Sequence, residues 1–347
     1  MYVDSHVHFR DFNQKHKETV RHGLEVARDS GLDAVFDMPN TDPPIMTRDL
    51  VEDRLRIAKE AGVSDVFYGF YMGLTADPEQ IKQASDIFRE FRQVIGMKLY
   101  AGHSVGNLGV INEEEQRGVY DPFAREGYQG VLAVHCEKES ELDPNTWNPQ
   151  QPITHCHARP EKAEVESVRD QLQYARKSGF NGKLHVAHIS SPSAVDLVVQ
   201  AKKEGLDISC GICPHHFIYD WSQMYDENGV LWKMNPPLRQ PESRERTFQQ
   251  LRNGDIDWIE TDHAPHSLTE KLENPFMSGI PGIAWWPVFE EFLKQNEFTD
   301  KQIEQLTYTN IVNRFGMDVQ KSQRRVKDRR ADYPFDPYKK MAVELDW

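Results

Sequence analysis

The chain opens with MYVDSHVHFR, where a predicted strand carries two histidines, His6 and His8, and is followed by Arg10. Side chains alternate between the two faces of an extended strand, so we predict that Asp4 shares one face with these three residues. Two neighbouring imidazoles can bind a divalent metal ion, and a guanidinium can bind a carboxylate. A His-x-His pair is a weak signal by itself, because a polar edge strand can carry histidines by chance. Residues elsewhere in the chain have to decide between the two interpretations.

Further metal-binding residue types lie at the ends of other predicted strands. Lys98 lies in VIGMKLY, His135 in GVLAVHC, His188 in KLHVAHI and Asp262 at the end of IDWIETD. If the strands form a barrel, their C-terminal ends share one rim, and these side chains meet there. Four histidines and one aspartate are too many for one tetrahedral ion with an open position. We therefore predict two ions, and zinc suits these ligands.

Lys98 is the candidate for the bridging group between the two ions. Metal ions about 3.5 to 4 Å apart need a bridging anion, and a lysine supplies one only when it is modified. Lys98 is predicted to face the barrel interior, where burial favours the neutral amine. A neutral amine captures carbon dioxide as a carbamate, so we hypothesise that carboxylated Lys98 and a hydroxide bridge two Zn²⁺ per subunit. Asp262 can accept the proton of the activated water and pass it to a leaving nitrogen, which predicts hydrolysis of an amide-like bond.

Eight short apolar runs alternate with segments of helical spacing. This alternation predicts parallel strands with right-handed crossovers, and eight of them close into a (β/α)8 TIM-type barrel. The competing doubly wound sheet usually has a glycine-rich turn after its first strand, and here that position reads HFRDF. We predict a barrel over 1–316 and a basic, proline-punctuated C-terminal appendage packed on it over 317–347. The predicted strands are 1–7, 33–39, 65–72, 94–100, 130–136, 183–189, 207–213 and 256–262.

Composition narrows the class of partner. The chain has 347 residues and a formal net charge of -14, from 55 acidic and 41 basic residues, which disfavours nucleic acid and anionic membrane surfaces. No stretch approaches the roughly 18 apolar residues of a membrane span, and the N-terminus has no signal pattern. Four cysteines are too few for a disulfide framework. We predict a cytoplasmic protein that acts on a small molecule.

Cys210 and Cys213 form a C-x-x-C motif, with His215 and His216 directly behind it. A small zinc site and thiols packed at a strand end are both compatible with this pattern. The second interpretation is better supported by the sequence, because no second ligand pair follows at the spacing of a zinc finger.

The motifs DSHVHFR, MPNT, GMKLY, VHCE, RPEKAE, HVAHIS, CPHHF, MNPPLR, TDHAPH and GIPG occur in this order along nearly the whole chain. Together they resemble the amidohydrolase superfamily, and more narrowly the dihydroorotases. Many relatives also carry an N-terminal stretch that forms half of a small β-sandwich, and we expect this chain to lack it. The resemblance implies a binuclear zinc site with the ligands His6, His8, Lys98, His135, His188 and Asp262, the last being also the general acid and base. It implies substrate contacts from Arg10, Asn40, Asn235, His266, Ser278 and Gly279.

The reaction implied by the resemblance is the reversible interconversion of N-carbamoyl-L-aspartate and L-dihydroorotate in pyrimidine (UMP) synthesis. Two alternatives stay open. Another cyclic amidohydrolase, of the hydantoinase or dihydropyrimidinase type, is disfavoured by Arg10 and Asn40. An inactive homologue that serves as a structural partner of another pyrimidine enzyme is disfavoured by the complete ligand set. We further expect the loop AGHSVGNLG to close over substrate through His103 or Ser104, and the chain to form a homodimer or to associate with aspartate carbamoyltransferase.

Overall fold

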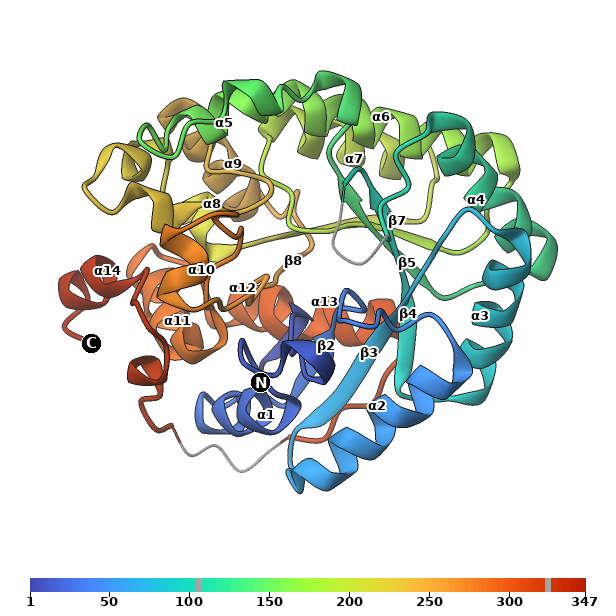
Figure 1. The fold of residues 1–347 in the computed structure, drawn as a ribbon, viewed down its shortest axis with the longest axis horizontal. Coiled ribbons are helices and arrows are strands. Elements are labelled where there is room, and N and C mark those ends of the chain that lie inside the picture. Colours follow the sequence, from blue (N-terminus) through green and yellow to red (C-terminus); the bar gives the residue numbers. More distant parts are fainter. Residues whose placement is uncertain (104–107, 322–325) are drawn as a thin grey trace.

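The computed structural model describes residues 1–103, 108–321 and 326–347. Eight parallel strands follow one another around a single sheet in the order of the sequence, and helices surround them (Figure 1). The predicted (β/α)8 barrel is therefore confirmed. The strands are β1 (Val3–Val7), β2 (Ala34–Asp37), β3 (Phe67–Gly73), β4 (Val94–Ala101), β5 (Val131–Cys136), β6 (Lys183–Val186), β7 (Ile208–Ile212) and β8 (Trp258–Ile259).

The long helices lie between consecutive strands, except α11, which follows β8, and capping residues mark several of their ends. The side chain of Asp77 caps the start of α3 by accepting from the Glu79 N–H, and α6 ends at Gly179 with a left-handed φ of 70°. None of the helices in the described ranges is long and apolar enough to cross a membrane. The long helices are α1 (Val20–Asp29), α2 (Arg48–Ala61), α3 (Pro78–Glu90), α4 (Glu113–Glu126), α6 (Glu161–Ser178), α7 (Pro192–Lys203), α9 (Pro241–Asn253) and α11 (Trp286–Gln295).

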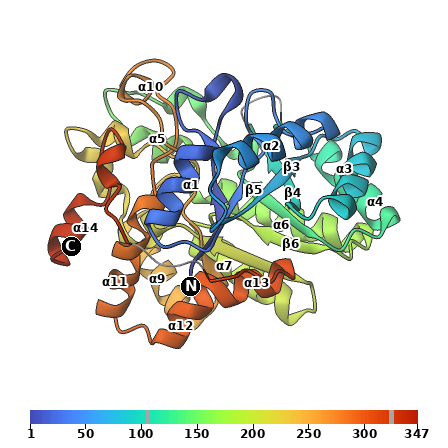
Figure 2. The ribbon, with the colours of Figure 1, turned by 90° about the horizontal axis from the view of Figure 1, so that it is seen from below.

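Shorter helices and turns lie in the connections and at the C-terminus. Figure 2 shows α10 at one end of the barrel and α12 and α13 at the other. The short helices are α5 (Thr154–Ala158), α8 (Pro214–Ile218), α10 (Leu268–Leu272), α12 (Asp300–Glu304), α13 (Asn310–Phe315) and α14 (Lys339–Glu344). Single turns are Phe12–Gln14, Glu139–Glu141, Pro144–Thr146, Trp221–Tyr225, Gly229–Trp232, Ile283–Trp285, Gln305–Thr309 and Arg330–Asp332.

The barrel interior is apolar at one end. Val3, Phe36, Tyr71 and Trp258 form one buried cluster there, and Phe315 from the end of α13 packs against it. The rings of Phe36 and Phe315 lie 4.8 Å apart between centroids. Because this plug excludes water from the N-terminal ends of the strands, polar chemistry inside the barrel is confined to the opposite rim.

Strand β1 is irregular between Asp4 and Val7, where its register with β2 shifts. Ser5 Oγ donates to Glu260 at 2.7 Å and His6 Nδ1 lies 3.7 Å from the same carboxylate, so these consecutive side chains lie on the same side. Asp4 instead accepts a hydrogen bond from Trp286 Nε1 of the outer helix α11 at 2.9 Å. The prediction that Asp4 shares the face of His6 is wrong, because the irregularity breaks the two-residue alternation.

The segment after α13 packs along the outside of the barrel. Tyr338 is buried, and Trp285 Nε1 donates to Asp336 at 2.7 Å. Arg329 pairs with Asp29 of α1 at 2.7 Å. The described part of the C-terminal segment is thus held by buried aromatic packing and by ion pairs to α1.

Candidate active site

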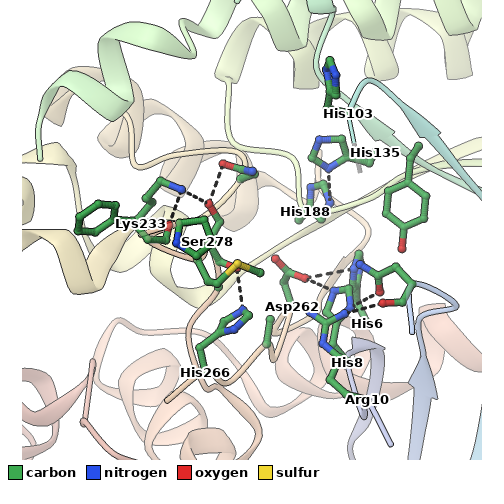
Figure 3. A pocket seen from close by; sticks show the side chains of 18 residues that line it. His6, His8, Arg10, His103, His135, His188, Lys233, Asp262, His266 and Ser278 are labelled. Carbon is green, nitrogen blue, oxygen red and sulfur yellow. Dashed lines mark hydrogen bonds and ion pairs between the residues drawn. The ribbon is translucent and has the colours of Figure 1, made fainter. Parts of the chain in front are cut away.

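A cavity of about 310 Å³ opens at the C-terminal ends of the strands (Figure 3). Most of the residues predicted for the site lie around it, although they are spread over the whole sequence. Lys98 does not line the cavity and lies fully buried on β4. The predicted residues that line the cavity are His6, His8, Arg10, Asn40, His135, His188, Asn235, Asp262, His266, Ser278 and Gly279.

One group of ligand atoms joins the end of β1 to the segment after β8. His6 Nε2 lies 3.2 Å and His8 Nε2 2.8 Å from Asp262 Oδ1. The ligand atoms of the three residues lie within 4.8 Å of one another, and all three residues are buried in the site. Burial, followed by the charge of the neighbouring Lys98, lowers the pKa of His6 to about 4, so the ring is neutral and can offer a lone pair. This geometry fits one metal ion.

A second group lies beside the first (Figure 3). His135 Nδ1 lies 3.1 Å from His188 Nε2. The buried Nζ of Lys98 has no hydrogen-bond partner among the described residues, and burial lowers the pKa of Lys98 to about 8. Two adjacent imidazoles and a buried amine without a partner form a donor set that fits a second ion and a modified lysine.

His8 and His135 each donate a hydrogen bond from one ring nitrogen to a neighbouring side chain, and this leaves the other ring nitrogen free to bind a metal ion. His8 Nδ1 donates to Asn40 Oδ1 at 2.7 Å, which leaves Nε2 to face Asp262. His135 Nε2 donates to Glu137 at 3.0 Å, which leaves Nδ1 to face His188. Metal-binding histidines commonly have such partners on their second nitrogen. Asn40 therefore has a role that the sequence did not indicate, while no hydrogen bond in the described residues uses its Nδ2.

The carboxylate of Glu137 is itself held in place by an arginine. Arg159 Nε and one terminal nitrogen donate to the two oxygens of Glu137 at 3.0 and 2.5 Å. Burial opposes ionisation of Glu137, but Arg159 and His135 outweigh it and hold the pKa of Glu137 well below its usual range. Sequence reasoning missed this pair, although VHCE and RPEKAE contain both residues.

His188 and Asp262 adopt left-handed backbone conformations, with φ of 40° and 49°. These values are unfavourable for residues other than glycine, and they are found mainly where the surroundings hold a functional side chain in place. Both residues lie just beyond short strands, His188 two residues after β6 ends at Val186 and Asp262 three residues after β8 ends at Ile259. The predicted strands over 183–189 and 256–262 are therefore too long at their C-terminal ends, because the chain turns there to point these side chains into the site.

Glu260 lies beneath this group and was not singled out from the sequence. It accepts from the His188 N–H at 2.6 Å and from Trp258 Nε1 at 3.0 Å, in addition to its contacts with Ser5 and His6. The carboxylate thus orients His6 from below and adds negative charge under the two ligand groups. Glu260 stands two residues before Asp262 in IETD, and this position is the sequence signal by which it could have been selected.

Arg10 supplies positive charge at the edge of the cavity. The guanidinium is buried, and one terminal nitrogen donates to the Asn40 carbonyl at 2.9 Å. Nε has no hydrogen-bond partner, and within the described ranges no carboxylate forms an ion pair with Arg10. A buried guanidinium without an anionic partner is costly, so this position favours a ligand that carries an anion.

The opposite side of the cavity is built from the segments around Asn235 and Ser278. Ser278 Oγ lies 3.4 Å from Asn235 Oδ1 and accepts from Lys233 Nζ at 2.9 Å. Lys233 also lines the cavity, and burial followed by the charge of Arg159 lowers the pKa of Lys233 to about 8. Sequence reasoning missed Lys233, which lies two residues before Asn235 in WKMNPPLR.

His266 and Gly279 shape the same side. His266 Nε2 donates to the Ser278 carbonyl at 3.0 Å, so this nitrogen is engaged by the backbone, while Nδ1 has no hydrogen-bond partner among the described residues. Gly279 has a φ of 131°, and a Cβ there would lie 2.6 Å from the Ala264 carbonyl oxygen. Only glycine fits this close approach.

The loop predicted to close over substrate is described in part. His103 lies at the cavity with its side chain 68 % exposed and pairs with Glu139 at 2.6 Å. Ser104 lies outside the described residues.

Comparison with known proteins places the chain in a family. No model of a protein family matches the chain. It is 32% identical over 314 residues to a dihydroorotase of Brevibacillus brevis, which covers 88% of this chain and 70% of the relative. It is 29% identical over 337 residues to an allantoinase of Salmonella paratyphi B, with 91% and 70% covered. The solved L-hydantoinase (dihydropyrimidinase) of Arthrobacter aurescens superposes with a TM-score of 0.81 at 23% identity, over 94% of this chain and 74% of that one.

The structural likeness supports the barrel fold, and the curated relatives identify the class as hydrolases acting on cyclic amides. Within this class, the chain belongs to the dihydroorotase family of the amidohydrolase superfamily.

Proposed function

We propose that the protein is a zinc-dependent dihydroorotase, which interconverts N-carbamoyl-L-aspartate and L-dihydroorotate in pyrimidine (UMP) synthesis. The observation that carries the proposal is the buried Arg10, which faces the cavity without an anionic partner among the described residues. A substrate carboxylate would neutralise this charge through a bidentate contact. The curated dihydroorotases at 30% and 32% identity support the same activity.

The donor set fits two metal ions. His6, His8 and Asp262 would hold one Zn²⁺, His135 and His188 would hold the other, and carboxylated Lys98 would join the two. Bound there, the ions would polarise the amide carbonyl and lower the pKa of water.

Asp262 moves the proton in this proposal. In the hydrolytic direction the water oxygen bonds to the ring carbonyl carbon, the carbon–nitrogen bond breaks, and Asp262 carries the water proton to the leaving nitrogen. Without bound metal, burial raises the pKa of Asp262, although His6 and Lys98 oppose this. Cyclisation follows the same path in reverse and releases water.

The remaining side chains orient the substrate. Arg10 binds the carboxylate, and the unused Nδ2 of Asn40 lies next to it on the same side. Asn235 and the backbone of Ser278 and Gly279 bind the amide groups of the ring, and His266 holds that backbone in position. Each contact restricts rotation of the ring and brings its carbonyl towards the ligand groups.

One assay tests the function. The purified protein with zinc is incubated with dihydroorotate, carbamoyl aspartate, hydantoin, dihydrouracil and allantoin, alongside Asp262→Asn. We expect turnover of the first two, and loss of turnover in Asp262→Asn with the fold retained by circular dichroism. Turnover of hydantoin, dihydrouracil or allantoin without dihydroorotate would contradict the proposal. No turnover of any substrate would favour an inactive structural homologue.

A second candidate function is allantoinase, which the relative from Salmonella paratyphi B favours. Allantoin carries no carboxylate, so it would leave Arg10 without an anionic partner. The substrate comparison above separates the two activities directly.

The proposal also covers the domain organisation, the cellular location and the assembly of the protein. We assign residues 1–316 to the catalytic barrel and 317–347 to a segment packed on it, in a cytoplasmic enzyme. Assembly as a homodimer or with aspartate carbamoyltransferase stays a prediction, which light scattering of the protein alone and mixed with that enzyme would test.

A further inference from the structure

A second cluster of metal-binding side chains lies outside the cavity, where β7 passes into α8. Cys213 directly follows β7, and His215 and His216 belong to α8. Their ligand atoms lie within 4.8 Å of one another. All three side chains are buried, with exposed fractions of 0%, 1% and 3%, and none of them lines the cavity.

One nitrogen of each histidine in this cluster has no partner. His216 Nε2 donates to the Pro236 carbonyl at 3.1 Å, so Nδ1 carries a lone pair, and it has no hydrogen bond to any described residue. His215 Nδ1 lies 3.3 Å from the Tyr338 hydroxyl, while its Nε2 is likewise without a partner. Unsatisfied polar atoms in the interior are uncommon, and each one is costly unless a bound group satisfies it.

The chemistry of the cluster matches a borderline metal ion. One thiolate and two imidazoles are typical zinc ligands. In a tetrahedral zinc site such atoms lie about 3.3 to 3.8 Å apart, so the side chains have to approach by about 1.5 Å at most from their present separation, which is within 4.8 Å. Burial raises the pKa of the Cys213 thiol well above its usual range, so the thiol stays protonated until a metal ion displaces the proton.

We propose that Cys213, His215 and His216 bind a third metal ion of the zinc class, separate from the two ions of the active site. The ion stabilises the structure. Through His216 it fixes Pro236, the neighbour of the substrate-binding candidate Asn235, and through His215 it fixes Tyr338 of the C-terminal segment. This assignment does not depend on the proposed function, because it rests on residues that take no part in the reaction.

Cobalt substitution tests the third site, because a thiolate ligand gives Co²⁺ a charge-transfer absorption in the near ultraviolet. None of the ligands proposed for the active site is a cysteine, so this band reports a thiolate outside that ligand set, and the Cys213→Ser variant shows whether the thiolate is Cys213 or one of the other cysteines. The full chain is loaded with Co²⁺, dialysed and analysed for bound metal and absorption. Cys213→Ser is compared with the control Cys210→Ser, a second fully buried thiol on β7 that lies outside the cluster.

We expect the wild-type protein and Cys210→Ser to retain three Co²⁺ per chain and the thiolate band. Cys213→Ser should retain two and lose the band. If Cys213→Ser does not fold, His216→Gln keeps the thiol and should lose the third ion. A wild-type protein that shows no thiolate band would overturn the proposal, and so would a band that survives in Cys213→Ser. If the wild-type protein shows the thiolate band but does not turn over dihydroorotate, the result contradicts the proposed function and supports the third metal site.

Discussion

Arg10 illustrates how a single side chain can determine substrate preference in a shared type of active site. Its guanidinium is buried at the cavity edge with Nε unsatisfied, while the histidines and Asp262 on the same rim are suited to bond cleavage. Lys233 adds a second positive charge across the cavity. In the proposed function, the ligand groups would carry out hydrolysis, and the two cations would favour an anionic substrate.

Replacement of Arg10 tests this division of roles. Arg10→Gln should lower kcat/KM for dihydroorotate about 10- to 150-fold, because it removes hydrogen bonds to a charged group that contribute about 1.5 to 3 kcal/mol. Competitive inhibition by dihydrouracil, which lacks the carboxylate, should change little. An equal loss for both molecules would show that Arg10 supports the structure of the site and does not recognise the carboxylate.

The lowered pKa of Lys233 predicts that substrate binding depends on pH. Its pKa is lowered to about 8, so the side chain is charged at neutral pH and loses its charge as the pH rises through about 8. We therefore expect KM for dihydroorotate to rise above this pH. Lys233→Gln should have a raised KM at neutral pH and a flat profile across the same range. A KM that is independent of pH in the wild-type protein would contradict a role for Lys233 in binding the anion.

Carboxylation of Lys98 can be observed directly. Incubation with ¹³C-bicarbonate should give one carbamate resonance in the ¹³C spectrum, and Lys98→Met should remove it. Because Lys98 is proposed to bind both ions directly, its loss should lower activity by more than the about 10- to 100-fold that loss of an outer metal-site partner costs. Lys271 is an internal control, because it is also fully buried but donates to the carbonyls of Lys233 and Gly279. A resonance that persists in Lys98→Met would place the modification elsewhere.

At the scale of elements, the C-terminal segment is tied to α1 through His22. His22 Nδ1 lies 2.5 Å from Glu18 and Nε2 lies 2.9 Å from Asp332. The hydrogen bond to Glu18 is the main cause that raises the pKa of His22 to about 9. The charged form of one side chain therefore joins a helix of the barrel to the segment that follows it.

This link predicts a loss of stability at alkaline pH. Because the pKa of His22 is higher in the folded state, its contribution is complete below the ordinary value of 6.5 and is lost as the pH rises through about 9. Amide hydrogen exchange of 326–347 should become faster relative to that of the barrel across this range. His22→Gln should abolish this difference, and His16→Gln, a change at an exposed histidine, should preserve it. The same pH dependence in His22→Gln would exclude His22 as its cause.

At the scale of the whole molecule, the barrel closes through side chains as much as through backbone pairing. Strand β8 has two residues, and the contact with β1 consists of a bridge between Val7 and His263 and of the His8 N–H bond to the His263 carbonyl at 2.8 Å. Asp4 reinforces this seam by accepting from the backbone and hydroxyl of Thr261 at 3.1 and 2.6 Å. The same seam carries His8 and Asp262, so closure of the barrel also sets the geometry of the site.

Removal of the Asp4 carboxylate should weaken the seam. Asp4→Ala leaves the donors of Thr261 and Trp286 without an acceptor in the interior, and we expect a loss of about 3 kcal/mol or more. Asp4→Asn retains one acceptor oxygen and should lose less. Denaturation in urea measures both variants, and equal stability of Asp4→Ala and the wild-type protein would contradict this role.

The sequence by itself determined the repeating architecture and the types of residue at the rim. Each strand and helix is specified by apolar spacing and capping residues within about ten positions, as at Asp77 and Gly179, so the barrel could be predicted locally. His6, His8, His135 and Asp262 could be chosen because each stands at the end of such a strand.

Only the tertiary structure decided which residues support these side chains. Glu260 bonds to Ser5 across 255 positions, and Lys233 bonds to Ser278 across 45. Such pairs join residues that come together only in the closed barrel with its loops packed, and neither periodicity nor local spacing encodes them. The irregularity of β1 could not be predicted from the sequence either. The register of β1 depends on the neighbouring strand and on the contacts between β1 and the segment after β8.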